Sequence, residues 1–128
     1  MNKSYLLVIC LLLTSFTGCL GSEDDDDKSA KIDCAPDCSY KDLSEMDLSG
    51  KDFSGTDFSF ANLTWANLTD TDLSGANLQY CFCDNASFVN ADLSGANLFA
   101  AFLIDSKMSG ANLDDASLAS AFLIGTDL

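Results

Sequence analysis

Residues 71–78 read TDLSGANL, and residues 91–98 read ADLSGANL. A second pair repeats at the same offset, because residues 101–104 and residues 121–124 both read AFLI. Both offsets are 20 residues, and within each eight-residue stretch a D-L or N-L pair recurs after five residues. Internal repeats decide an architecture before single elements are considered. The sequence therefore has two nested periods, five and 20.

The five-residue period separates inward from outward positions. An apolar residue stands at every fifth position from Leu43 to Leu128, 18 times without a break. Two residues before each lies a mostly small residue, which is alanine in ten cases, and Asp or Asn lies between the two in 12 of 18 units. A period of five fits neither an α-helix nor a strand, but residues two apart in an extended segment share a side. Each unit is therefore predicted to form one short side of a coil, with the intervening residue outward and Ser-Gly at the corner.

The 20-residue period predicts four such sides in each coil. Coils stacked at the strand spacing of ~4.8 Å would form a rod roughly 22 Å long, with about 4.5 coils from the 18 units. The unit Ala91-Asp92-Leu93-Ser94-Gly95 resembles the motif of the pentapeptide-repeat family. The resemblance covers residues 41–128, with residues 36–40 as a degenerate first unit, and it implies an all-β fold, a right-handed quadrilateral β-helix over residues 36–128. Lys41, Met46 and Lys51 depart from it by occupying the small inward column, so the first coil is expected to be open.

The amino-terminal residues 1–18 have the pattern of a signal peptide. Lys3 precedes an apolar run, residues 6–13, that is too short to span a membrane comfortably. The sequence FTGC at residues 16–19 resembles a prolipoprotein processing box, which implies that Cys19 is lipidated and anchors the exported chain to the outer side of a membrane. A plain secretory signal is the alternative. Residues 19–35, which include four consecutive aspartates, have the composition of an acidic tether.

Composition argues against an enzyme. The chain has 20 acidic residues, six lysines and neither histidine nor arginine, giving a formal net charge of −14. The usual general base, imidazole metal ligand and bidentate phosphate clamp are therefore missing. An acidic chain repels nucleic acid, so a nucleic-acid partner is not expected. The sequence predicts no catalytic residue, no metal site and no cofactor.

Two cysteine pairs matter for the predicted fold, one at the boundary between the tether and the repeats and one within the repeats. Cys34 and Cys38 flank the start of the repeats, where a disulfide would fix the amino-terminal end in an oxidising compartment. Cys81 and Cys83 occupy the small and large inward positions of one unit, which favours two buried thiols that pack as apolar residues. A redox pair or metal site at Cys81 and Cys83 is the alternative.

Aromatic residues break the outward polar pattern on one side of the predicted coil. Phe82, Phe102 and Phe122 replace Asp or Asn at 20-residue intervals and are expected to stack. An apolar stripe of this kind on a soluble rod indicates a partner, although stacked rings also stabilise a sheet by themselves. The candidate partner surface consists of these three residues and their expected neighbours Ile104, Ile124, Trp65, Tyr80 and Phe99, and Phe60 is expected on the adjacent side with Tyr80 and Phe99.

The next side is acidic. Asp52, Asp72 and Asp92 are expected to stack, with Asp114 and Asp115 beyond, either as a solvated face or as a Ca²⁺ site. Some members of the resembled family use acidic faces as DNA mimics that bind gyrase. That role would require an unprocessed cytosolic chain.

The functional hypothesis is a membrane-tethered extracytoplasmic module that presents a surface for protein interaction or structural support. One alternative is a cytosolic DNA-mimicking inhibitor of an enzyme such as gyrase. Another is a non-binding structural spacer of the cell envelope. The last inward residue, Leu128, also suggests an end-to-end homodimer, because an uncapped solenoid end exposes its core.

Overall fold

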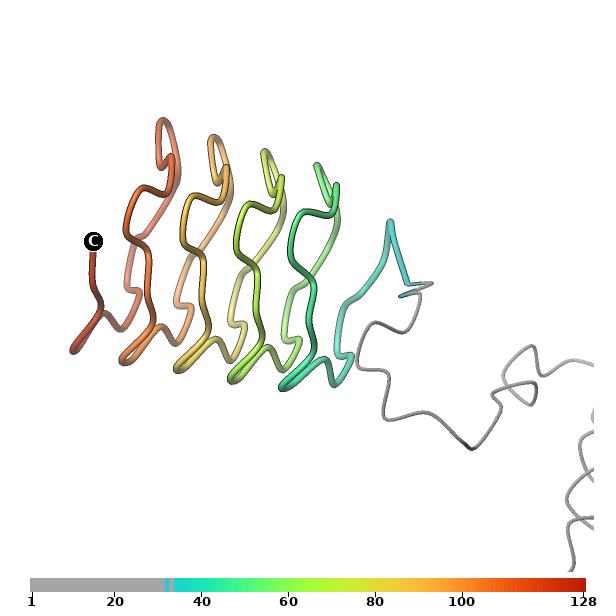
Figure 1. Cartoon of the computed structure of the whole chain (residues 1–128), viewed down its shortest axis with the longest axis horizontal. Coiled ribbons are helices and arrows are strands. Elements are labelled where there is room, and N and C mark those ends of the chain that lie inside the picture. The colour runs from blue at the N-terminus through green and yellow to red at the C-terminus, as the bar shows by residue number, and fades with distance from the viewer. Residues whose placement is uncertain (1–31, 33) are drawn as a thin grey trace, which may run out of the picture.

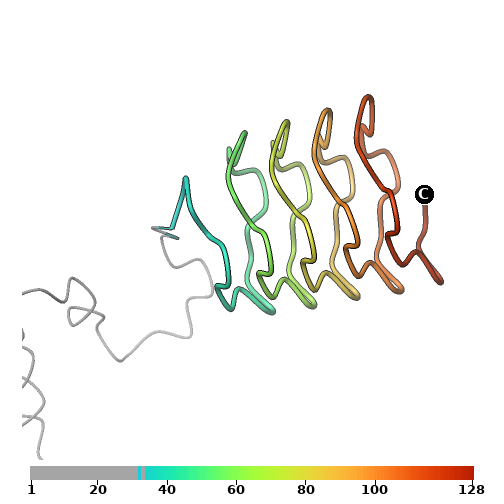
Figure 2. The ribbon, with the colours of Figure 1, turned by 180° about the vertical axis from the view of Figure 1, so that it is seen from behind.

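A stack of coils makes up the part of the chain that the structure describes. The structure is a computed structural model that describes Ile32 and residues 34–128 (Figure 1). The predicted signal peptide, Cys19 and most of the predicted tether lie outside the described residues. Seen from behind, the coils follow one another in chain order along one axis (Figure 2). No helix in the described residues is long and apolar enough to cross a membrane.

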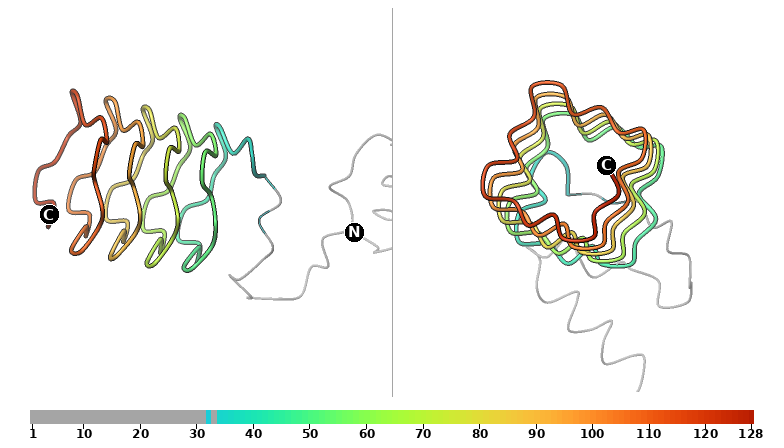
Figure 3. Two further views of the ribbon diagram at one scale, coloured as in Figure 1. Left: turned by 90° about the horizontal axis from the view of Figure 1, so that it is seen from above. Right: turned by 90° about the vertical axis from the view of Figure 1, so that its left-hand side faces the viewer.

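The register between coils is 20 residues at every side. All 15 β-bridges are parallel and join residues 20 apart, from Asp37–Asp57 to Lys107–Asp127. Bridge residues follow one another at intervals of five, with a two-residue turn between them. In the end-on view the coils superimpose around a common axis (Figure 3). The predicted four-sided coil of 20 residues is therefore present, while the count of about 4.5 coils stays a prediction.

The sides are shorter than regular strands. Across residues 34–128 no residue belongs to a helix or to a regular strand, and each side contributes a single bridge residue. A five-residue unit leaves only three residues between turns, so one bridge to each neighbouring coil is all that a side can form. The β character of the fold therefore lies in isolated parallel bridges repeated along the axis.

Backbone hydrogen bonds join each side to the coils before and after it. The N–H of Leu63 donates to Phe82 O at 2.7 Å, and the N–H of Phe82 donates to Ala61 O at 2.9 Å. At the corner the N–H of Trp65 donates to Asp84 O at 3.0 Å, and that of Ala66 closes the turn onto Leu63 O at 2.9 Å. The same pattern recurs along the rod and satisfies backbone groups that short sides alone would leave unpaired.

The corners adopt a backbone conformation that side chains disfavour. The second corner residue has a positive φ at six glycines and at twelve other residues, including Trp65 at 64° and Ala100 at 53°. Non-glycine residues in this region cost energy relative to glycine. Because most corners carry a side chain, the hydrogen bonds between coils must hold them in place.

The two inward columns form the core. Leu48, Phe58, Phe88 and the other large inward residues through Met108 are almost fully buried, and so are the alanines that precede them. At the amino-terminal end Met46 is half-buried and packs against this core, whereas Lys41 is exposed. From Ala111 to Leu123 the inward apolar residues are only partly buried, and Leu128 is exposed. The core therefore fills the rod axis and leaves the outward column of each side free for other chemistry.

Candidate functional site

One side of the rod carries a column of stacked phenylalanine rings. Phe82 and Phe102 have ring centroids 5.2 Å apart and planes within 8°, and Phe102 and Phe122 follow at 4.9 Å and 4°. The predicted stacking is therefore confirmed. Phe102, with a ring on each side, is half-buried, whereas Phe82 and Phe122 at the two ends of the column are 45% and 46% exposed. We call these three residues the phenylalanine column.

The corner after this side adds further apolar surface. Trp65 and Ile124 are among the most exposed large hydrophobic residues described, and Ile104 is half-buried. The backbone N–H of Ile104 donates to Asp84 Oδ1 at 2.9 Å, which fixes this corner to the coil before it. These three residues follow the side of the phenylalanine column along the chain, and a shared surface with that column stays a prediction.

A second aromatic column runs along the corner before this side. Tyr40, Phe60 and Tyr80 stack at centroid distances of 5.0 and 4.9 Å, with planes within 9°. Phe99 meets Tyr80 edge-on at 5.6 Å and 81°, because it lies one residue earlier at its corner than the 20-residue register requires. We call Tyr40, Phe60, Tyr80 and Phe99 the corner column. The sequence analysis missed Tyr40, although its 20-residue spacing from Phe60 was available as a signal.

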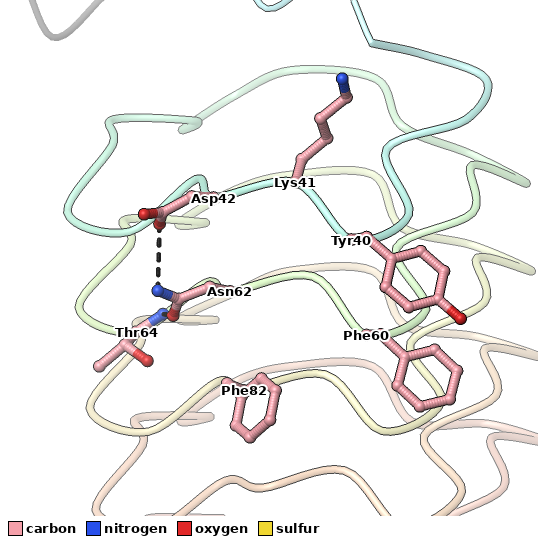
Figure 4. Close-up of a pocket in the computed structure, with 7 residues that line it drawn as sticks. All are labelled: Tyr40, Lys41, Asp42, Phe60, Asn62, Thr64 and Phe82. Atoms are coloured by element: carbon pink, nitrogen blue, oxygen red, sulfur yellow. Dashed lines mark hydrogen bonds between the residues drawn. The ribbon is translucent and has the colours of Figure 1, made fainter.

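A shallow pocket opens where the phenylalanine column ends. It has a volume of about 420 Å³ and lies on the same side of the rod, between the corner column and Phe82. Figure 4 shows Asp42 and Asn62 above Phe82, with Tyr40 and Phe60 beside them. The full lining consists of Tyr40, Lys41, Asp42, Phe60, Asn62, Thr64 and Phe82.

Outward aspartates are fixed by the turn that follows them. The backbone N–H and hydroxyl of Ser44 both donate to Asp42 Oδ1, at 3.2 and 2.7 Å. These two hydrogen bonds lower the pKa of Asp42, with the hydroxyl of Ser44 as the larger cause, and the hydrogen bond from the amide of Asn62 lowers it further. The same turn lowers the carboxyl pKa of four more outward residues, namely Asp37, Asp47, Asp52 and Asp92. Hydrogen bonds to the ionised form favour it, so these carboxylates stay charged at neutral pH.

The acidic side continues differently from the prediction. Asp52, Asp72 and Asp92 do lie in register. The next residue of their column is Asn112, whose amide donates to Asp92 Oδ1 at 3.2 Å, and neither Asp114 nor Asp115 continues it. Among residues 34–128 no group of three or more His, Cys, Asp or Glu residues could hold a metal ion.

Both cysteine pairs are disulfide-bonded in the structure. Cys34 and Cys38 are joined across the first turn, with Cα atoms 4.9 Å apart. Cys81 and Cys83 are also joined, with Cα atoms 5.8 Å apart, and both are fully buried. The expectation of two buried thiols at Cys81 and Cys83 is therefore wrong, because side chains two residues apart on one extended side point into the same narrow core.

Comparisons with known proteins identify the fold. A model of pentapeptide repeats matches in eight copies over residues 42–75, 66–103 and 99–128. No curated protein sequence matches the chain. Pentapeptide-repeat proteins form right-handed quadrilateral β-helices and are generally non-enzymatic structural or binding proteins.

Solved structures of such proteins are similar to this chain. Rfr23 from the cyanobacterium Cyanothece 51142 is 34% identical with a TM-score of 0.67, over 71% of this chain and 60% of that one. HetL from the cyanobacterium Nostoc sp. PCC 7120, which is involved in the regulation of heterocyst differentiation, is 28% identical with a TM-score of 0.55, over 68% of this chain and 39% of that one. The chain thus spans less than two thirds of either relative. Since the repeat model extends over most of its length, the chain belongs to the pentapeptide-repeat family.

Proposed function

We propose that this chain is a membrane-tethered extracytoplasmic module whose aromatic side binds another protein. The amino-terminal residues support the tether, because a signal-like segment ends at Cys19 and an acidic stretch separates it from the repeats. The phenylalanine column supports the binding role. Outward positions of the rod are polar in most units, yet three successive coils place a phenylalanine there.

Exposure of the phenylalanine column is the observation that carries the proposal. Burying an apolar ring is worth roughly 1.5–3 kcal/mol, so a ring left nearly half exposed forgoes part of that free energy. The corner column and Trp65 extend the same surface on both flanks. Contiguous apolar surface of this kind marks interaction sites on soluble proteins.

Two experiments test the tether and the surface separately. Intact-mass analysis of the protein from membrane and soluble fractions of its own host should find a chain that begins at Cys19 and carries a diacylglycerol. A full-length, unmodified chain in the cytosol would overturn the tether and would favour a DNA-mimicking inhibitor instead.

For the surface, a photoreactive phenylalanine at position 102 should cross-link a discrete partner in the host envelope. The control is the same residue at position 112, an outward position ten residues further along and therefore on the opposite side of the coil. Equal labelling at positions 102 and 112, or none at either, would favour a non-binding spacer.

A further inference from the structure

The phenylalanine column ends at Phe82, which lines the shallow pocket described above. Within the described residues Phe82 has one ring partner, Phe102, which covers one of its two faces. The next residue of the same column, Asn62, is joined to Phe82 by a bridge but carries a short polar side chain. The phenylalanine column therefore ends at Phe82, and no other ring of the described residues stacks on the second face of Phe82.

The hydrogen bonds of Asn62 direct its side chain away from this ring. Its Nδ2 donates to Asp42 Oδ1 at 3.0 Å, and its Oδ1 accepts the N–H of Thr64 at 3.1 Å. Both polar ends are thus engaged with Asp42 and with the turn at Thr64. Figure 4 shows the resulting gap between Asn62 and the ring of Phe82.

The pocket has room for an aromatic side chain and offers it an aromatic wall. Its volume is about 420 Å³, and a dry cavity of roughly 150 Å³ is enough to hold benzene. The stacked rings of Tyr40 and Phe60 form one wall. A ring entering here would continue the phenylalanine column at the spacing already present and would gain an offset-stacked contact with Phe82, the arrangement that aromatic pairs prefer.

The negative charge of Asp42 favours a cationic group on the ligand, next to the aromatic ring. Asp42 lines the pocket as an ionised carboxylate, and Asp37 and Asp47 occupy the outward positions of the two neighbouring units. Lys41 also lines the pocket, but Figure 4 shows its ammonium group pointing away from Asn62 and Phe82. A cation on the ligand would therefore meet Asp42, while an anion would meet a chain with a net charge of −14.

We propose that the pocket at Phe82 binds an aromatic side chain of a partner protein, next to a lysine or arginine that pairs with Asp42. This assignment rests on the protein-binding role proposed above and names the chemistry of its partner. A second copy of this chain fits poorly, because it would bring an equally acidic surface against Asp42. An anionic lipid surface or a nucleic acid is disfavoured by the same repulsion.

The test uses the full chain in detergent and three peptides of matched size. These are acetyl-Lys-Trp-Lys-amide, acetyl-Lys-Ala-Lys-amide and acetyl-Glu-Trp-Glu-amide. Binding is followed by the chemical shifts of isotope-labelled phenylalanine rings. We expect saturable shifts at Phe82 with the Lys-Trp-Lys peptide, and affinity at least tenfold lower for the other two.

The structure offers matched controls for both contacts. Phe82→Leu keeps an apolar side chain against Phe102 but removes the flat ring face. This variant should lower the affinity for the Lys-Trp-Lys peptide at least tenfold. Val89→Ala changes an apolar corner residue outside the phenylalanine column and the corner column, and should leave binding unchanged. Asp42→Asn should reduce the preference for Lys-Trp-Lys over Glu-Trp-Glu, whereas Asp52→Asn, in the same kind of turn on another side, should not.

Several outcomes would overturn the assignment. Equal loss of binding in the Phe82 and Val89 variants would mean that the pocket at Phe82 is not the binding site. Equal affinity for the acidic and basic peptides would remove the role of Asp42. Concentration-dependent dimers in sedimentation that disappear in Phe82→Leu would identify a second copy as the occupant, and Phe82-dependent binding to phosphatidylcholine vesicles would identify a lipid surface. Failure here, with cross-linking from position 102 intact, would leave the wider protein-binding role standing.

Discussion

The side-chain amide of Asn62 donates a 3.0 Å hydrogen bond to the carboxylate of Asp42, the outward residue of the preceding coil. The same relationship joins Asn67 to Asp47 and Asn77 to Asp57, at 3.0 and 3.1 Å. In each of these three pairs an aspartate is followed, 20 residues later, by an asparagine, whereas Asp37 and Asp57, like Asp52 and Asp72, keep two aspartates in register. Like charges in register would repel, and at these three positions an amide replaces that repulsion with a hydrogen bond.

Asn62→Asp should therefore destabilise the rod. The variant removes the donor and places two carboxylates in register, so we expect the melting temperature to fall by a few degrees, and by less at high salt because screening weakens the repulsion. Asn97→Asp is the control. Its column neighbours are Asn77 and Ser117, and its Oδ1 accepts a turn N–H from Phe99, as Asn62 does from Thr64. Equal melting temperatures for the two variants would contradict the pairing.

Acid should weaken the rod through its turn aspartates. Hydrogen bonds from the following serine lower the carboxyl pKa of Asp37, Asp42, Asp47 and Asp52 below 3.8 in the folded state. At a pH well above 3.8 these carboxylates contribute fully to the free energy of unfolding. This contribution is lost as the pH falls from about 3.8 through the lowered folded pKa, because the unfolded chain takes up protons at a higher pH than the folded chain does.

Replacing all four aspartates by asparagine should flatten this dependence. Asparagine accepts the same turn N–H, as Asn62 and Asn67 do. Melting temperature measured against pH should therefore drop less steeply below pH 3.8 in the variant than in the wild type. Parallel curves would show that these turns do not hold the ionised form.

The middle ring of the phenylalanine column should matter more for stability than its end. Phe102 stacks on two rings and Phe122 on one, and an aromatic pair contributes roughly 0.5–1.5 kcal/mol beyond its buried area. We expect Phe102→Leu to lower the free energy of unfolding by about 1 kcal/mol more than Phe122→Leu. Denaturant titration measures both, and a double-mutant cycle of Phe82 with Phe102 isolates the pair. Equal losses would mean that the rings contribute only as separate apolar groups.

Substitution of alanine by glycine should affect stability differently at the first and the second residue of a corner. Ala100 has a φ of 53°, where a Cβ costs roughly 1–2 kcal/mol. Ala100→Gly relieves this cost, which offsets the ~0.5–1 kcal/mol of entropy that glycine loses on folding. The net expectation is no loss, or a gain of up to about 1 kcal/mol. Ala119 does not have a positive φ, so Ala119→Gly should only destabilise. Chemical denaturation measures the free energy of unfolding of both variants. Equal decreases in this free energy would contradict the strain at Ala100.

The inward columns and the 20-residue register could be predicted because each depends on chain periodicity alone. Leu63 lies below Leu43 whatever conformation their side chains adopt. The stacking of Phe82 on Phe102 follows from the same register. What escaped prediction depends on where side chains point within that frame. The amide of Asn62 turns toward Asp42, and the sulfur atoms of Cys81 and Cys83 meet inside the core.

The pocket escaped prediction for a related reason. It exists because Asn62 points toward Asp42, so its space is set by a hydrogen bond between two coils and not by any residue type in the motif. The sequence did identify Phe82 as part of an exposed stripe. It gave no sign that the ring is the end of a stack with one face uncovered.

The invariant 20-residue register also restricts how a chain of this kind can change its length. Insertion of one residue would move every later side chain out of its inward or outward position. Insertion of five would preserve the core but rotate all later sides by one, which would separate Phe102 and Phe122 from Phe82. Only a gain or loss of 20 residues keeps both the core and the columns. Surface columns such as the aromatic one can therefore lengthen by duplication of whole coils, one ring at a time.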